Sequence, residues 1–390
     1  MAAAPKPYIT TLTPLRGIAA LLVVAYHSNR GFAPIAPITA TSLFANGWLW
    51  VDFFFMLSGF ILCYTYEESF TGSVTRASYA KYIGARIARI YPLHLMSTLW
   101  MFAISIAILR VATSVTGWAA GMLRPTALPA CLLLVQSIHV YDEPPLNPPA
   151  WSLSTEWWVY LVFPFLVPVF YRLQRGGKVA AALAVIGLYL ALRYVVGAWS
   201  FGVPTIAVTA DFGLVRCLIG FACGMLLHKL YRDRTGYRLL RTNAAFLVGL
   251  FGAVAAMHFD AMDIAIVAFF PLVILAAAHN GGLVKRGLDT RVLQRLGTWS
   301  FSIYMIHVPI MSLLLLHMVN QNPALLSGVT TGAPTTPSYG FGAIAAATLI
   351  LVTVGLSALT YRFIEVPGRN LLNRMFKTQR QTPMVGTAKI

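Results

Sequence analysis

Two ionisable side chains in the first apolar stretch, Arg16 and His27, could do chemistry inside a membrane. They lie eleven residues apart, so at about 100° per residue they share one face of a helix, about 16 Å apart along its axis. An ionisable group at bilayer depth costs at least about 2.5 kcal/mol, so each needs a reason. Because imidazole transfers protons near neutral pH, His27 is predicted to be a catalytic base. The alternative places Arg16 at cytoplasmic headgroups and His27 in the far interface.

Two carboxylates, Asp52 and Glu156, lie near the starts of two predicted spans. Asp52 lies among the aromatic residues of 48–60, in the same predicted half of the bilayer as His27. The two could therefore pair as a base and the acid that orients it, and a structural pair of Asp52 with an arginine or a backbone donor is the alternative. Glu156 follows a serine and a threonine, which suits either chemistry or an ordinary capped helix start.

Two arginines and a polar stripe complete this set of residues. Arg86 and Arg89 lie three residues apart before a predicted span, so they face the same way on a helix. Their guanidinium groups suit the phosphates of a soluble donor and anionic lipid headgroups equally well. Ser300, Tyr304 and His307 follow helical spacing inside an apolar run, and either a buried polar network or a substrate groove explains them.

Other familiar chemistries are absent from the sequence. It has no phosphate-binding glycine-rich loop, no His-Glu-x-x-His metal pair and no Gly-x-Ser-x-Gly nucleophile elbow. Its four cysteines lie in apolar stretches without the spacing of metal ligands. The sequence therefore indicates no metal.

Membrane-spanning helices are the elements that must position these residues. Hydrophobic residues make up 58% of the chain and charged residues only 11%, against about 25% charged in a soluble domain. The apolar runs match the roughly 20 residues that a helix needs to cross a bilayer. The sequence predicts an all-α, polytopic transmembrane bundle of about ten spans, at 12–28, 46–66, 92–112, 156–172, 179–197, 211–228, 243–258, 263–280, 300–318 and 340–361.

The distribution of charge predicts the orientation of these spans. With the N-terminus inside, 23 of the 29 basic residues fall on cytoplasmic segments, as the positive-inside rule requires. The apolar piece 128–140 is short for a span, and counting it as one would destroy this bias, so it is predicted to be re-entrant or interfacial. Both termini are then cytoplasmic. The chain divides into a transmembrane domain, 1–369, and a basic cytoplasmic tail, 370–390, and its charge of +17 reflects sidedness rather than nucleic-acid binding.

Taken together, these residues resemble the membrane acyltransferase-3 family over essentially the whole chain. Each matching segment is weak alone, but their order along the chain is specific. The matching segments are an Arg-x10-His motif at Arg16 and His27, Val51-Asp52-Phe53-Phe54 through Ser58-Gly59-Phe60, Arg86-x-x-Arg89 with Tyr91-Pro92, Trp151-Ser152-Leu153 with Glu156, Ser302-Ile303-Tyr304 with His307, and Tyr361, Phe363, Ile364, Glu365 and Pro367.

The resemblance implies O-acylation, usually acetylation, of a sugar, glycan or other envelope hydroxyl in the plasma (bacterial inner) membrane, with acyl-CoA from the cytoplasm as donor. A transporter or flippase of a glycolipid or acylated product, using the same buried polar residues, is the competing hypothesis. The expected site residues are His27, Arg16, Asp52 and Glu156 for catalysis, Arg86 and Arg89 for coenzyme A, and Ser302, Tyr304, His307 and Trp151 for the substrate.

Overall fold

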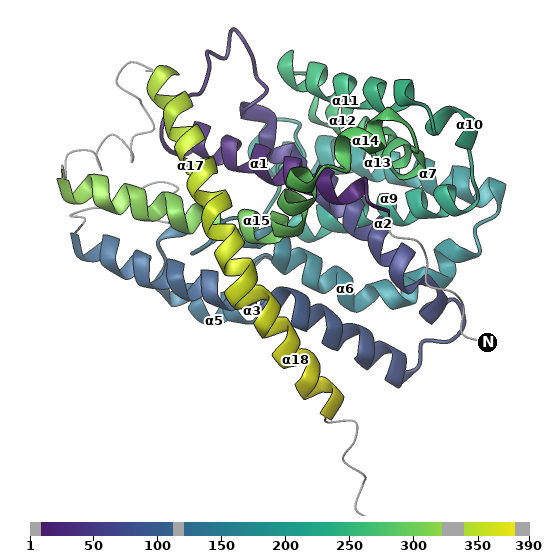
Figure 1. Cartoon of the computed structure of the whole chain (residues 1–390), viewed down its shortest axis with the longest axis horizontal. Helices are drawn as coiled ribbons and strands as arrows, with labels where there is room; N and C mark the ends of the chain where they lie inside the picture. The colour runs from purple at the N-terminus through teal and green to yellow at the C-terminus, as the bar shows by residue number, and fades with distance from the viewer. Residues whose placement is uncertain (1–8, 112–120, 322–338, 379–390) are drawn as a thin grey trace, which may run out of the picture.

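All regular secondary structure in the described residues is helical, as predicted. The computed structural model describes residues 9–111, 121–321 and 339–378, and within these ranges it contains no strand. Most helices are α-helices, η1 and η2 are 3-10 helices, and η3 and η4 are π-helices. In chain order the elements are α1 (Leu12–Gly31), η1 (Ala45–Leu49), α2 (Trp50–Phe70), α3 (Arg76–Val111), η2 (Pro125–Ala127), α5 (Leu128–Leu132), α6 (Ala150–Tyr171), α7 (Arg175–Ala191), η3 (Leu192–Gly197), α8 (Ala198–Phe201), α9 (Gly213–Arg232), α10 (Tyr237–Leu240), α11 (Asn243–His258), α12 (Asp263–Val267), α13 (Phe270–His279), α14 (Leu283–Leu288), α15 (Arg291–Gln321), α17 (Tyr339–Thr360), η4 (Tyr361–Glu365) and α18 (Val366–Thr378) (Figure 1).

Six helical segments in the described ranges are long and apolar enough to cross a membrane. Of the other four predicted spans, 12–28 and 300–318 lie in α1 and α15, and 243–258 and 263–280 lie in the shorter apolar helices α11 to α13. Of the roughly ten predicted spans, six therefore correspond to helices with the length and hydropathy of a membrane span. These six are Ala45–Phe70, Arg76–Arg110, Ala150–Tyr171, Arg175–Phe201, Gly213–Arg232 and Tyr339–Phe376.

The apolar segment 128–140 does not form a spanning helix. It consists of the five-residue helix α5 followed by turns and bends, in agreement with its prediction as a non-spanning segment. At the other end of the chain, α17, η4 and α18 follow one another as one long rod across the face of the molecule (Figure 1). This rod includes the first residues of the predicted tail 370–390, which are helical up to Thr378, and the rest of that tail lies outside the described residues.

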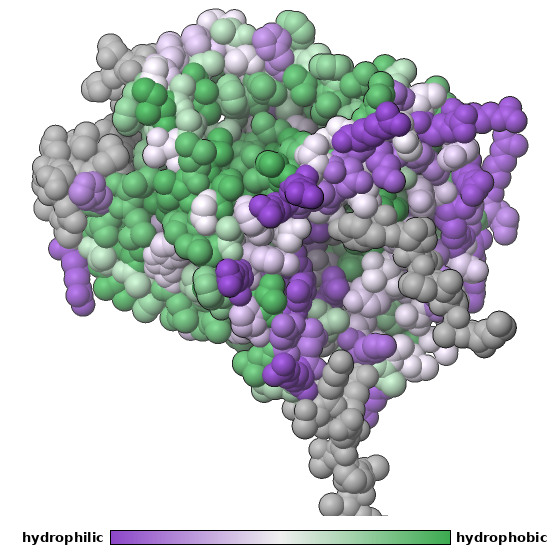
Figure 2. Space-filling view, in the orientation of Figure 1, coloured by the Kyte–Doolittle hydropathy of each residue, from purple (hydrophilic) through white to green (hydrophobic). Residues whose placement is uncertain are grey.

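Hydrophobic and hydrophilic residues separate on the molecular surface. Figure 2 shows hydrophobic residues over most of the left and centre of this face, and hydrophilic residues along its right side. In Figure 1 the start of α3 and helix α10 lie on that right side. Both carry basic residues assigned by sequence to the cytoplasmic segments, such as Arg76 and Arg238.

The helices differ in how deeply they are buried. In the most apolar 18-residue stretch of each segment, 72% of the residues are buried for Ala45–Phe70 and for Gly213–Arg232, against 17% for Arg175–Phe201. Helices α2 and α9 are therefore central, and α7 presents its hydrophobic residues outward. Asp52 of α2 and Arg216 of α9 are consequently buried in protein and do not face lipid.

Glycines allow the central helices to approach each other closely. A Cβ atom on Gly59 of α2 would meet the Phe221 backbone of α9, and one on Gly224 of α9 would meet the Met56 backbone of α2. At the crossing of α1 and α15, Gly17 lies directly against the backbone of Gly297. Small residues at helix crossings let backbones touch, and these two crossings hold α1, α2, α9 and α15 in place around the polar residues.

Replacing Gly224 by alanine is expected to lower the melting temperature of the detergent-solubilised protein. The added methyl group would overlap the Met56 backbone, and such overpacking costs about 1–3 kcal/mol. Gly355→Ala in α17 is the matched control, because a Cβ there meets nothing within 4 Å and alanine favours a helix. Equal melting temperatures for the two variants would contradict the close crossing.

Candidate active site

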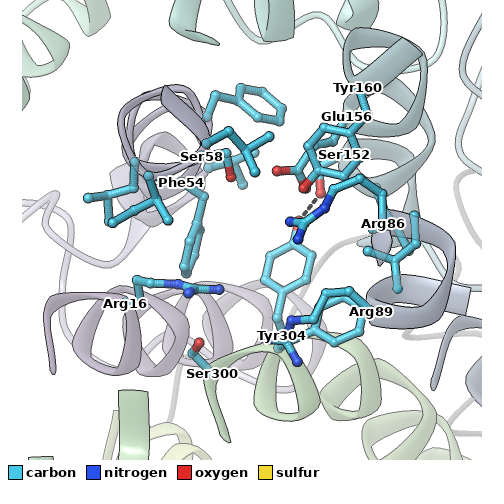
Figure 3. A pocket seen from close by; sticks show the side chains of 18 residues that line it. Arg16, Phe54, Ser58, Arg86, Arg89, Ser152, Glu156, Tyr160, Ser300 and Tyr304 are labelled. Atoms are coloured by element: carbon cyan, nitrogen blue, oxygen red, sulfur yellow. Dashed lines mark hydrogen bonds between the residues drawn. The ribbon is translucent and has the colours of Figure 1, made fainter. Parts of the chain in front are cut away.

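A small cavity, the inner cavity, lies between α1, α2, α3, α6 and α15. Its volume is about 140 Å³. The side chains of Arg16 and Arg86 point into it from opposite sides (Figure 3). Its polar lining residues are Arg16, Ser58, Arg86, Arg89, Ser152, Glu156, Tyr160, Ser300 and Tyr304. Three guanidinium groups thus face one lining carboxylate, which favours an anionic ligand.

A larger cavity, the outer cavity, has a volume of about 1190 Å³. Helices α1, α9 and α15 contribute to its wall, together with η1, α2 and the segments 139–151 and 200–211. Its polar and aromatic lining residues are Tyr26, His27, Asn29, Arg30, Trp48, His139, Tyr141, Asp142, Glu143, Trp151, Ser200, Phe201, Thr205, Thr209, Asp211, Arg216 and Tyr304. His27, Trp151 and Tyr304 are the predicted site residues among them.

The two cavities meet at Val51 and Tyr304, which line both. The Tyr304 hydroxyl is 2.7 Å from the Ser152 hydroxyl, with which it shares a hydrogen bond drawn in Figure 3, and it donates to the Pro149 carbonyl over 3.1 Å. Tyr304 is thereby held between the cavities. His27 and the arginines of the inner cavity thus line two cavities that share the side chain of Tyr304.

His27 is paired with a second imidazole that comes from α15. Its Nδ1 lies 3.0 Å from the Val23 carbonyl and 3.2 Å from Nε2 of His307, whose own Nδ1 lies 3.3 Å from the Ile303 carbonyl. Because a carbonyl only accepts, Nδ1 of each ring carries the hydrogen. His27 Nδ1–H is then shared between Val23 and His307, and the lone pair of His27 lies on Nε2. A neutral imidazole with a free Nε2 beside a cavity can accept a proton.

Asp52 does not pair with His27, which corrects that expectation. Its carboxylate accepts hydrogen bonds from Arg216 Nε at 3.1 Å and Nη2 at 2.5 Å, and both side chains are almost completely buried. Arg216 also donates to the Val208 carbonyl over 3.3 Å. Its guanidinium lies 4.7 Å from the ring centre of Trp48 and 5.5 Å from that of Trp151. The alternative, a structural pair of Asp52 with an arginine, is the one observed.

Glu365 of η4 binds two of the predicted site residues. Arg89 forms an ion pair with its Oε1, and Ser302 donates to its Oε2 over 3.0 Å. Ser302 is fully buried and lines neither cavity, so the structure does not place it at a substrate site. His307 likewise lines neither cavity and acts on His27 instead. Of the four expected substrate contacts, Trp151 and Tyr304 face a cavity.

Arg86 retains hydrogen-bonding capacity toward the inner cavity. It donates to the Tyr66 hydroxyl over 3.0 Å and lies over the rings of Tyr66, Tyr82 and Tyr160. Its buried Nε has no hydrogen-bond partner among the described residues. A buried donor without a partner is costly, and an anion in the cavity would satisfy it. Glu156 also lines the inner cavity, away from His27.

Sequence reasoning missed two partners, Arg216 and Glu365. Arg216 lies near the start of a predicted span in the outer half of the bilayer, and a buried arginine there is itself a signal of a carboxylate partner. Glu365 lies in the last matched segment and had no assigned role. Within the described parts of the chain, no group of three or more His, Cys, Asp or Glu residues is arranged to hold a metal ion.

The fold and the site define a helical membrane protein with two cavities that share Tyr304, a smaller one lined by arginines and a larger one lined by the imidazole of His27. The family model described as "Acyltransferase domain" matches residues 11–357. The chain therefore belongs to the membrane acyltransferase-3 family and is an acyltransferase. It is similar to "Acyltransferase MdmB" of Streptomyces mycarofaciens, with 30% identity over 94% of this chain and 93% of that protein.

Two further relatives carry acetyltransferase names. "Putative peptidoglycan O-acetyltransferase YrhL" of Bacillus subtilis (strain 168) is 24% identical over 95% of this chain, which spans 56% of that protein. "Putative acetyltransferase ORF330" of Acidianus two-tailed virus is 26% identical over 62% of this chain and 64% of that protein. No solved structure matches the chain.

Proposed function

We propose that this protein transfers an acyl group, in particular acetyl, from acyl-CoA to a hydroxyl of a sugar, glycan or other envelope acceptor, with His27 as the base. The observation that carries this proposal is the pair of cavities that share Tyr304, one cationic and the other lined by His27. The acetyltransferase names of two relatives support acetyl as the group transferred. The proposed setting is the plasma (bacterial inner) membrane, with both termini cytoplasmic, a catalytic domain at 1–369 and a basic tail at 370–390.

The donor enters the inner cavity. Arg16 and Arg86 form no ion pair with a described carboxylate, whereas Arg89 is paired with Glu365. Arg16 and Arg86 are therefore available to bind the phosphates of coenzyme A, whereas the charge of Arg89 is balanced by Glu365. The thioester then extends toward Tyr304, at the boundary with the outer cavity.

The acceptor reaches His27 from the outer cavity. His27 Nε2 takes the hydroxyl proton while the acceptor oxygen bonds to the thioester carbonyl carbon. The carbon–sulfur bond breaks, and the proton on the imidazole passes to the leaving thiolate, so coenzyme A departs as a thiol. His307 Nε2 accepts from His27 Nδ1–H and so stabilises the transient imidazolium in the correct orientation.

The direct test is incubation of the purified protein with radiolabelled acetyl-CoA and an envelope extract of cells that make it. Acyl transfer releases coenzyme A and puts label into the extract. A transporter of an acylated product would release no coenzyme A above the rate without protein, and that result would overturn the proposal.

Replacing Arg86 by glutamine is expected to raise the KM for acetyl-CoA about 10- to 100-fold, with a smaller change in kcat. Hydrogen bonds to charged groups contribute about 1.5–3 kcal/mol, and Arg86 is the cavity arginine with an unused buried donor. Steady-state kinetics with varied acetyl-CoA measures this. Arg238→Gln, which removes an exposed arginine outside both cavities, is the matched control. An unchanged KM for Arg86→Gln would show that the donor binds elsewhere.

A further inference from the structure

We propose that the acceptor carries a positive charge, as a protonated amine, in addition to the hydroxyl that is acylated. This inference rests on the proposed function and names the class of its acceptor. The observation behind it is the charge of the outer cavity. Asp142, Glu143 and Asp211 line it, in a chain with only 12 acidic residues against 29 basic ones. A cavity lined by one sign of charge concentrates ligands of the opposite sign.

The basic residues of the same cavity do not cancel these carboxylates. The charge of Arg216 is balanced by the carboxylate of Asp52, to which it donates two hydrogen bonds. Arg30 is the other lining arginine, and it donates to the Tyr26 hydroxyl over 2.9 Å. Three carboxylates against the single charge of Arg30 leave two negative charges in excess. The inner cavity has the opposite balance, so the two cavities favour ligands of opposite charge.

The size and the walls of the outer cavity favour an organic cation over a metal ion. The three carboxylates do not converge: within the described residues, no group of three or more potential ligands is arranged for a metal. The cavity of about 1190 Å³ exceeds the usual size of a small-molecule site. Tyr26, Trp48, Tyr141, Trp151 and Phe201 line it, and aromatic surfaces pack well against cyclic ligands.

A charged amine would also determine which atom is acylated. An ammonium group has no lone pair, so it cannot attack a thioester. Carboxylates stabilise the protonated form, which leaves a hydroxyl of the same molecule as the nucleophile for His27. The acidic wall would thus select O-acylation over N-acylation of an amine-bearing acceptor, such as an amino sugar that is free or at the end of a glycan.

Cysteine labelling at Thr209 tests the charge of the cavity without knowledge of the natural acceptor. Thr209 lines the outer cavity, whereas the four native cysteines are buried. The measured quantity is the labelling rate with a cationic trimethylammonium methanethiosulfonate divided by the rate with an anionic sulfonate methanethiosulfonate. For Thr209→Cys this ratio is expected to be about tenfold higher than for a free thiol in solution. Adding Asp142→Asn, Glu143→Gln and Asp211→Asn should return the ratio toward that of the free thiol. Glu68→Gln, which removes an exposed carboxylate outside the cavity, should not.

A protection assay tests the acceptor class itself. Methyl glucosaminide, which carries the amine, should slow labelling of Thr209→Cys by neutral N-ethylmaleimide at a lower concentration than methyl N-acetylglucosaminide. If the acceptor is the end of a glycan, a glucosamine trimer should protect at a lower concentration still. Equal protection by the amine and its N-acetyl form, or a cation-to-anion labelling ratio no greater than that of a free thiol, would overturn the inference. Failure of the proposed function would appear separately, as absence of coenzyme A release from the unmodified protein.

Discussion

Replacing His27 by alanine is expected to lower acceptor-dependent release of coenzyme A about 10²- to 10⁴-fold, which is the usual contribution of a general base. The reason is geometric. His27 presents its free Nε2 beside the outer cavity, while Val23 and His307 hold Nδ1. The measurement is the initial rate of thiol appearance from acetyl-CoA, made on protein of unchanged melting temperature.

His139→Ala is the matched control for this variant, because His139 is a second imidazole that lines the outer cavity and has no contact with His307. It should retain most of the activity. His307→Gln should lie between the two and shift the pH dependence of kcat, since it removes the acceptor from His27 Nδ1. If His27→Ala releases coenzyme A at the wild-type rate, the assigned base is wrong.

Removing one partner of the buried pair formed by Asp52 and Arg216 is the second change with a large expected effect. Asp52→Ala should destabilise the protein by about 3–5 kcal/mol, because it leaves a buried guanidinium without a counter-charge. Arg216 is only 1% exposed, so water cannot replace the carboxylate. Thermal unfolding in detergent, followed by fluorescence, measures the loss.

The double variant Asp52→Leu with Arg216→Met separates a structural pair from a catalytic one. Replacing a whole buried pair by apolar residues is often close to neutral for stability, so this variant should regain most of the lost melting temperature. If Asp52 instead acted through His27, Asp52→Asn would lower kcat and alter its pH profile at an unchanged melting temperature, which would contradict the assignment of Asp52 to Arg216.

The sequence predicted the polar residues better than it predicted their partners. Helical spacing placed Arg16 and His27 on α1, and both face a cavity. It could not reveal that Asp52 binds Arg216, 164 residues away, or that His27 meets His307, 280 residues away. These pairs depend on which helices cross, and side-chain periodicity along one helix carries no information about its neighbour.

The same limit explains the differences in the fold. Apolar run length identified six helices of the described chain that are long and apolar enough to cross a membrane. Helices α11 to α13 are short and packed in part against protein, and length alone does not separate a short span from a buried helix. The continuation of α17 through η4 into α18 was not predicted either. It brings Glu365 to Arg89 and Ser302, contacts that a tail beginning at 370 did not imply.

The central claim is that an acyl group passes from a donor in the inner cavity to an acceptor beside His27. Sealed, everted membrane vesicles from cells that make the protein test it most directly. Radiolabelled acetyl-CoA is added outside, and label protected in the lumen is counted for the wild type and for His27→Gln. The account predicts luminal, covalently bound label with the wild type and loss of nearly all of it with His27→Gln. Equal luminal label from both proteins would contradict it.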